Sequence, residues 1–120
     1  AFILSSTTEQ WGLVVNEAMA AGLPVLVSDR CGCASDLVKE GENGFTFDPY
    51  DPSGLATLMA RMAHGNVDRS AMGRASQDRI GEWSPNRFAE GLEKAIQRAV
   101  RSPPSSSVFD QILMRVLMHR

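Results

Sequence analysis

Residues 8–24 of the chain read Thr8-Glu9-Gln10-Trp11-Gly12-Leu13-Val14-Val15-Asn16-Glu17-Ala18-Met19-Ala20-Ala21-Gly22-Leu23-Pro24. Within the apolar run at its centre only Asn16 and Glu17 are polar, and so apolar a run predicts a buried helix. Gly22 and Pro24 end this helix, because glycine is favoured just after a helix and proline cannot continue one. A carboxylate on a buried helix is costly unless its oxygens are satisfied. We therefore expect Glu17 to contact a ligand.

Short apolar runs on both sides of this helix predict two buried parallel strands. They are Phe2-Ile3-Leu4-Ser5 and Val25-Leu26-Val27-Ser28. Strand, loop, helix (about 12–21) and strand form one βαβ unit, whose loop lies at the carboxyl edge of the sheet. Open α/β sheets bind their ligands at that edge. The sequence therefore predicts an α/β fold with a parallel sheet and flanking helices.

Further elements follow to the end of the chain. We predict a short helix over 34–40, a strand over 45–47, and helices that begin at Asp51-Pro52, cover 67–80 and begin at Ser84-Pro85. Residues 1–100 then form one partial domain, residues 101–107 a Ser/Pro linker, and residues 108–120 an amphipathic tail helix.

Composition restricts the class of protein. The chain has 120 residues, 43% of them hydrophobic and 22% charged, which suits one soluble domain. A net charge of −2 argues against a nucleic-acid partner. Cys31 and Cys33 are too close for a good disulfide and too few for a structural zinc site, so we expect packed thiols in a reducing cytoplasm. No run has transmembrane length. Because a strand begins at Ala1, we expect a fragment of a longer protein.

The two glutamates flank a helix N-terminus that could hold a phosphate. Such a terminus exposes unpaired N–H groups, and Gly12 allows close approach to them. Glu17 lies about 7 Å farther along the axis, where a carboxylate can accept hydrogen bonds from ribose hydroxyls. Glu9 would then face the other end of the ligand. The alternative from the residues alone is that Glu9 is a solvated loop residue and Glu17 a surface residue.

The surrounding residues resemble the E-x7-E motif of family 4 glycosyltransferases. The similarity extends from Ala1 to Ala63, and more generally in layout to Val100. Its residues are Glu9-Gln10-Trp11-Gly12-Leu13-Val14, Glu17-Ala18-Met19-Ala20, Gly22-x-Pro24-Val25, Ser28-Asp29, Gly32, Gly41-Glu42-Asn43-Gly44-Phe45, Asp48-Pro49 and Leu55-Ala56.

This resemblance implies a GT-B fold, two Rossmann-like domains around a cleft, of which the chain is part of the donor domain. It implies that Glu9 holds the transferred sugar near the reacting carbon and is the catalytic candidate. Gly12 and Leu13 would offer N–H groups to the sugar or diphosphate, Glu17 would bind the ribose, and Gly32 would offer unobstructed backbone. Transfer of a hexosyl group from a nucleotide-sugar would be retaining, with neither a metal nor another cofactor.

The sequence departs from the family pattern at the candidate site. Gln10-Trp11 stands where Pro-Phe is common, and Cys31-Gly32 stands where a pair of glycines is usual. The acidic residue expected three positions after that pair is replaced by Ser35, with Asp36 beside it. The basic residues that neutralise the diphosphate in family members would lie before Ala1.

The resemblance also sets expectations about partners and setting. The acceptor, a glycan, lipid or small molecule, is not identified by the sequence, and its domain would precede Ala1. We expect polysaccharide or glycoconjugate synthesis in a bacterial cytoplasm, with membrane-surface binding by the tail helix as the weakest alternative. A non-catalytic donor-binding remnant is the competing hypothesis, and the chain alone is expected to be inactive. A Rossmann-type oxidoreductase is disfavoured, because no glycine-rich fingerprint follows a strand.

Overall fold

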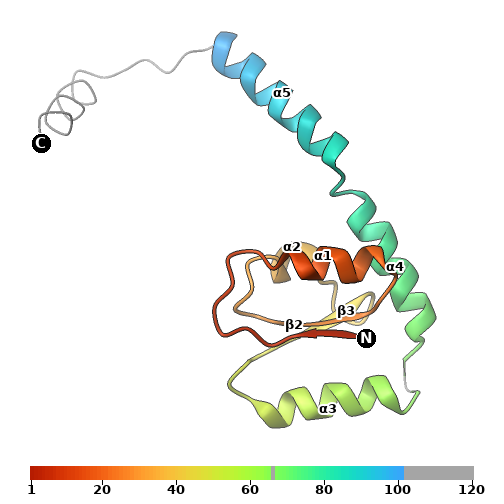
Figure 1. Cartoon of the computed structure of the whole chain (residues 1–120). Coiled ribbons are helices and arrows are strands. Elements are labelled where there is room, and N and C mark those ends of the chain that lie inside the picture. Colours follow the sequence, from red (N-terminus) through yellow and green to blue (C-terminus); the bar gives the residue numbers. More distant parts are fainter. Residues whose placement is uncertain (66, 102–120) are drawn as a thin grey trace, which may run out of the picture. The chain divides into compact units, whose positions relative to one another are not determined.

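The computed structural model describes residues 1–65 and 67–101, and it divides the chain into a unit Ala1–Ser84 and a second unit from Pro85 onward. The first unit contains three strands and four helices within the described residues (Figure 1). They are β1 (Phe2–Leu4), α1 (Leu13–Ala20), β2 (Val25–Ser28), α2 (Ala34–Leu37), β3 (Gly44–Phe47), α3 (Pro52–Ala63) and α4 (Arg69–Gly81). The second unit contains α5 (Pro85–Arg101). Residues 102–120, with the predicted tail helix, lie outside the described residues, and Arg101, assigned to the linker, ends α5.

The three strands form one parallel sheet in the order β1-β2-β3, which confirms the predicted α/β fold. Leu26 at the centre of β2 lies opposite Ile3 of β1 and Phe45 of β3. All four residues of β2 are buried. This explains why the central strand reads as a continuous apolar run rather than an alternating one.

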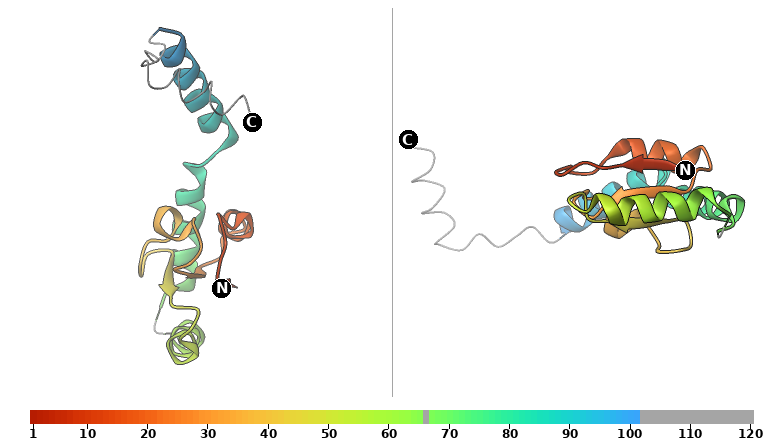
Figure 2. Two further views of the ribbon diagram at one scale, coloured as in Figure 1. Left: turned by 90° about the vertical axis from the view of Figure 1, so that its left-hand side faces the viewer. Right: turned by 90° about the horizontal axis from the view of Figure 1, so that it is seen from below.

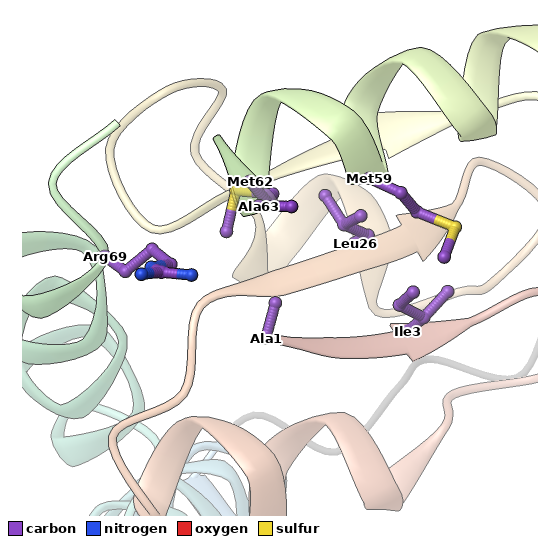
Figure 3. A pocket seen from close by; sticks show the side chains of 7 residues that line it. All are labelled: Ala1, Ile3, Leu26, Met59, Met62, Ala63 and Arg69. Carbon is purple, nitrogen blue, oxygen red and sulfur yellow. The ribbon is translucent and has the colours of Figure 1, made fainter. Parts of the chain in front are cut away.

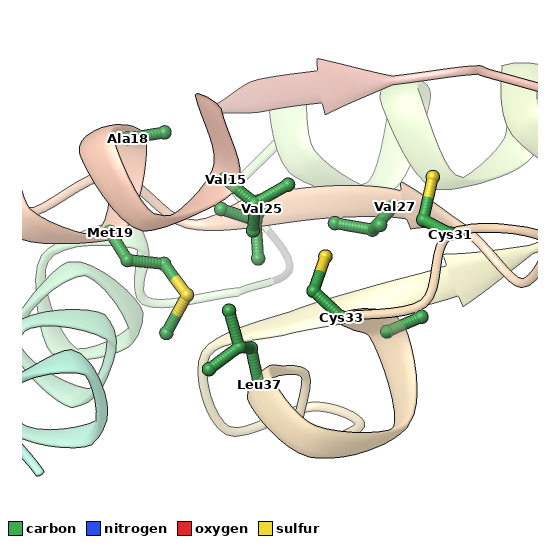
Figure 4. Packing of buried hydrophobic residues seen from close by; sticks show 9 residues of the cluster. Val15, Ala18, Met19, Val25, Val27, Cys31, Cys33 and Leu37 are labelled. Carbon is green, nitrogen blue, oxygen red and sulfur yellow. The ribbon is translucent and has the colours of Figure 1, made fainter. Parts of the chain in front are cut away.

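Each face of the sheet has its own apolar core. Val25 and Val27 pack with buried residues of α1 and with Cys33 and Leu37 (Figure 4). Leu26, on the opposite face, packs with aromatic residues of β3 and with Met62 of α3. Figures 1 and 2 show α1 and α2 on one side of the sheet and α3 on the other. Helices on both faces of a parallel sheet are the layer arrangement that the βαβ pattern predicts.

The helix α1 is not fully buried, so the burial predicted for it is wrong. Val15, Ala18 and Met19 face the core, whereas Leu13 is 69% exposed and Glu17 is exposed as well. One helix on the face of a sheet buries only the stripe that touches the strands, whatever the composition of its outer face. Glu17 therefore meets no desolvation cost here.

The helix α2 stops at Leu37, earlier than the predicted end at residue 40, because a buried asparagine organises the turn that follows. The Asn43 Oδ1 atom accepts a hydrogen bond from the Lys39 N–H at 2.7 Å, and Asn43 Nδ2 donates to the Leu37 carbonyl at 2.9 Å. Asn43 thus satisfies backbone groups that a longer helix would have paired internally. The turn then leads directly into β3.

The second unit presents an apolar stripe along α5. Phe88, Leu92 and Ile96 recur at helical spacing, as predicted, and all three are exposed. Among the described residues, no helix combines the length and the apolar character needed to cross a membrane.

The helix α4 is attached to the rest of the first unit through close contacts with turns. A Cβ atom on Gly73 would lie 2.2 Å from the Gly22 carbonyl oxygen. Gln77 Nε2 donates to the Ala20 carbonyl at 3.3 Å, and Arg79 Nη2 donates to the Asp36 carbonyl at 2.6 Å. Gly73 is therefore required by the contact between α1 and α4 and not by backbone conformation.

We predict opposite effects for two glycine substitutions in this one helix. Gly73→Ala should lower the free energy of unfolding by about 1–3 kcal/mol, because the methyl group would separate α4 from the turn at Gly22. Gly81→Ala is the matched control, since its Cβ would meet nothing within 4 Å. Its better helix propensity should leave stability unchanged or raise it by up to about 1 kcal/mol. Urea unfolding of both variants measures the difference, and equal stabilities would contradict the assigned contact.

Candidate functional site

The loop between β1 and α1 is joined to the loop after β2 by backbone pairing. Glu9 and Cys31 form an isolated parallel bridge, in which the Gly32 N–H donates to the Glu9 carbonyl at 3.0 Å. The Cys33 N–H donates to the Trp11 carbonyl at 3.2 Å. Both loops leave the carboxyl ends of neighbouring strands, and the bridge extends that edge of the sheet. The predicted ligand edge is therefore a fixed surface.

Gly12 is the N-cap of α1, and its backbone explains why glycine stands there. Its φ of 91° and ψ of 62° lie in the left-handed region, which side chains disfavour. A Cβ atom would also approach Leu4 Cδ2 to 3.0 Å and Glu9 Cγ to 3.4 Å. Gly12 thus turns the chain into the helix and brings the Glu9 side chain beside the helix start.

The N-terminus of α1 has the character of an anion site. No side chain caps it, and the Val15 N–H already bonds to the Gly12 carbonyl at 2.9 Å. The N–H groups of Leu13 and Val14 then have no partner within the helix. With the positive end of the helix dipole, two such groups favour a negatively charged ligand.

Gly32 lies where the two loops meet. Its N–H donates to the Glu9 carbonyl, and its role as unobstructed backbone for a ligand stays a prediction. A Cβ atom there would lie 1.9 Å from the Gln10 carbonyl oxygen. Glycine at this position permits the two loops to touch, and Gly32 shapes the site through that contact.

Glu9 and Glu17 occupy different environments. Glu9 is half-buried, and its Oε1 atom accepts a hydrogen bond from the Trp11 N–H at 3.3 Å. The Glu17 carboxylate has neither a hydrogen bond nor an ion pair among the described residues, and it shares the exposed face of α1 with Leu13, four residues earlier. The structure therefore brings Glu9, Gly12 and Gly32 into one cluster and places Glu17 farther along the helix.

Two residues that hold this cluster were not identified as functional from the sequence. Trp11 Nε1 donates to Asn16 Oδ1 at 3.1 Å, which ties the loop to α1. The Trp11 ring also packs against the core beneath α1. The position of Trp11 between Glu9 and Gly12 could have indicated a role in the site. The hydrogen bond from Trp11 to Asn16 could not be predicted, because no sequence pattern marks a bond between side chains five residues apart.

The cysteines are free thiols packed against this loop, as predicted. Burial raises the pKa of the Cys33 thiol to about 11, with Cys31 and Glu9 adding further repulsion of negative charge. Burial, then Glu9, also raises the pKa of Cys31. Both groups are therefore neutral thiols at physiological pH and poor nucleophiles. Within the described residues no cluster of three or more His, Cys, Asp or Glu side chains could hold a metal ion.

An open cavity of about 180 Å³ lies away from this cluster, between the sheet and α3 (Figure 3). Ile3, Leu26 and Met59 line it together with Arg69, and none of the candidate site residues does. Its lining offers apolar surface and one guanidinium but no carboxylate. The candidate site is thus the loop edge and not this cavity.

The parallel sheet with helices on both faces is an α/β domain of the Rossmann-like class. Residues 1–79 match the family described as "Glycosyl transferases group 1". The chain therefore belongs to this family of GT-B glycosyltransferases.

Several relatives share this similarity. The chain is 38% identical to a sulfoquinovosyl transferase of Arabidopsis thaliana over 68% of its own length and 16% of the relative's. It is 31% identical to an alpha-1,3/1,6-mannosyltransferase of Neurospora crassa over 88% of its length and 23% of the relative's. A solved sucrose-phosphate synthase from Thermosynechococcus elongatus matches with a TM-score of 0.68 and 26% identity, over 82% of this chain and 25% of that one. The chain thus spans less than a third of the length of these three proteins.

We predict that the Cys33 thiol makes stability pH-dependent in the alkaline range. Because its folded-state pKa is raised from 9.0 to about 11, folding favours the neutral thiol. The stabilisation is complete below the ordinary thiol pKa of 9.0 and is lost as pH rises towards about 11.

Urea unfolding of the wild type and Cys33→Ala across this range gives the measurement, since the variant retains every other titrating group. The stability difference between the two proteins should shrink as the pH rises above 9.0. A difference that stays constant with pH would show that the Cys33 thiol titrates normally.

Proposed function

We propose that this chain is part of the donor-binding domain of a retaining glycosyltransferase that uses a nucleotide-sugar. The observation that carries the proposal is the uncapped N-terminus of α1 with the Glu9 carboxylate beside it. A diphosphate would accept hydrogen bonds from the Leu13 and Val14 N–H groups. The sugar on one side of it would meet Glu9, and the nucleoside on the other side would meet Glu17.

The role of Glu17 follows from its free carboxylate. Its oxygens are exposed and unpaired on the same helix face as Leu13, so they can accept hydrogen bonds from two adjacent ribose hydroxyls. The distance along the helix, about 7 Å from Gly12, suits a ligand that extends from diphosphate to ribose. Glu17 would act as a binding residue.

The role of Glu9 would be electrostatic. In retaining transfer, the bond from the anomeric carbon to the diphosphate breaks and the acceptor hydroxyl bonds to the same face of that carbon. The diphosphate leaves with the bonding electrons and takes up the hydroxyl proton. Positive charge develops on the sugar in between, and a carboxylate fixed nearby stabilises it without forming a bond. No metal is needed where N–H groups and basic side chains neutralise the diphosphate.

We expect the chain alone to bind a donor without transferring its hexosyl group. The family resemblance implies that such enzymes hold the acceptor in a further domain across the cleft. Release of free sugar or glycosylated acceptor by the 120-residue chain would contradict this expectation.

Calorimetric titration with UDP, GDP, UDP-glucose and GDP-mannose tests the assigned roles. We predict that Glu17→Gln weakens the nucleoside diphosphate and its nucleotide-sugar equally, by about tenfold or more, because hydrogen bonds to a charged group are lost. Glu9→Gln should weaken the nucleotide-sugar alone.

The matched control is Glu42→Gln, an exposed glutamate in the turn before β3, which should bind as the wild type does. Wild-type affinity in Glu17→Gln would rule out the ribose role. Failure of the wild type to bind any of the four ligands would argue against donor binding by this chain.

A further inference from the structure

The two tryptophans of the chain, Trp11 and Trp83, form a pair within the first unit. Their ring centroids are 5.4 Å apart and the planes are inclined by 45°. Aromatic rings at this separation attract each other beyond the area that they bury. Trp11 packs inward against the core, and Trp83, itself 44% exposed, lies against it. The contact joins the loop that carries Glu9 to the end of α4.

Trp11 transmits the position of its ring to Glu9 through a short set of bonds. Its indole N–H is held by Asn16 at 3.1 Å and its carbonyl by the Cys33 N–H at 3.2 Å. Its own N–H donates to the Glu9 carboxylate at 3.3 Å. The Trp11 N–H shares a peptide plane with the Gln10 carbonyl, which packs closely against Gly32. The planes on either side of it are held by the Gly32 and Cys33 N–H groups, so the direction of this N–H is restricted and the Glu9 side chain follows it. A displacement of the Trp11 ring therefore changes how Glu9 is presented.

Trp83 is held in place by the end of α4. Its N–H donates to the Ile80 carbonyl at 2.9 Å, in the last turn of α4. The same helix is bound to α1 and to the end of α2 by Gln77 and Arg79. Gly73 adds the close contact with Gly22. Trp83 thus follows a helix that is held against the end of α1 and against α2, and it can resist movement of Trp11.

We propose that Trp11 and Trp83 are positioning residues for Glu9, so that the end of α4 sets the orientation of the site's sugar-facing carboxylate. The part of this proposal that concerns the sugar rests on the proposed function. The part that concerns the loop does not. Trp83 supplies none of the groups proposed to bind the diphosphate or the ribose, so its loss should affect the sugar end of the ligand and leave the nucleotide end unchanged.

The first experiment measures the loop without any ligand. In Trp83→Ala, amide hydrogen exchange at Gly32 and Cys33 should accelerate by about twofold to tenfold, the factor that a lost aromatic contact of this kind explains. These two amides report on the loop because they donate to Glu9 and Trp11. Trp83→Phe should restore slow exchange, and Tyr50→Ala, which removes an exposed aromatic ring elsewhere, should have no effect. If Trp83→Ala does not fold, Trp83→Leu retains the apolar bulk without a ring face.

The second experiment separates positioning from mere stability. For whichever of UDP-glucose or GDP-mannose the wild type binds, Trp83→Ala should weaken binding of the nucleotide-sugar by about twofold to tenfold while binding of UDP or GDP alone is unchanged. A structural defect would weaken both ligands together. Trp83→Phe should restore the wild-type ratio.

The outcomes keep the two proposals distinct. Unchanged exchange at Gly32 and Cys33 in both Trp83→Ala and Trp83→Leu would overturn the positioning role, whatever the chain binds. Equal weakening of nucleotide and nucleotide-sugar would also overturn it. If the wild type binds no nucleotide but exchange is still faster in Trp83→Ala, the coupling between Trp83 and the loop is supported. Donor binding is then rejected instead.

Discussion

The close approach of two loops at Gly32 determines the geometry of the site. A Cβ atom there would lie 1.9 Å from the Gln10 carbonyl oxygen, so only glycine allows the loop after β2 to touch the loop after β1. That contact permits the Gly32 N–H to bond to Glu9 and the Cys33 N–H to bond to Trp11. Loops at the carboxyl edge of a parallel sheet are otherwise free to move independently. Here the backbone pairing makes them one surface, and Glu9 takes its position from it.

The helix α4 gives this surface its support from outside the βαβ unit. It contacts α1 at Gly73 and Gln77 and the end of α2 through Arg79. Ser76 adds a buried hydrogen bond to the Asn43 carbonyl, which belongs to the turn before β3. One polar helix thus contacts turns that are distant from each other in sequence. Its charged composition is typical of a solvated surface helix. Its structural role depends instead on two small residues, Gly73 and Ser76, and on the long polar side chains of Gln77 and Arg79.

The local elements could be predicted from the sequence because local rules govern them. The helix start at Asp51-Pro52 and the helix end at Gly22 are set by capping chemistry. Both appear where expected, with Asp51 accepting hydrogen bonds from Ser53 and Gly54 and Gly22 adopting a φ of 73°. The three strands likewise follow from apolar runs and a turn signal. These helix ends and strands depend on residues that are only a few positions apart in the sequence.

The features that were missed depend on contacts between distant segments. The bond between Gly32 and Glu9, and the pairing of Trp11 with Trp83, join residues that no sequence period relates. The end of α2 comes earlier than the sequence predicts, because the Asn43 side chain, six residues further on, donates a hydrogen bond to the Leu37 carbonyl. The exposure of α1 was misjudged because composition does not tell how much of a helix its neighbours cover. The spaced residues of the E-x7-E motif predict the location of the candidate site, and tertiary contacts set the shape of that region.

The exposure of Glu17 changes the physical basis of its role. In a buried helix, its carboxylate would need a partner to remain charged. In this structure the carboxylate is exposed to solvent, so its charge needs no buried partner. What distinguishes it from other exposed glutamates is its place on α1, on one face with Leu13 and beyond an uncapped helix start. Glu9 differs in the opposite way, since its carboxylate is already held by the Trp11 N–H. A ligand along this edge would therefore meet one carboxylate held by a hydrogen bond and one with no hydrogen bond among the described residues. That division suits the proposed roles, in which Glu9 faces a sugar whose geometry is critical and Glu17 holds a ribose.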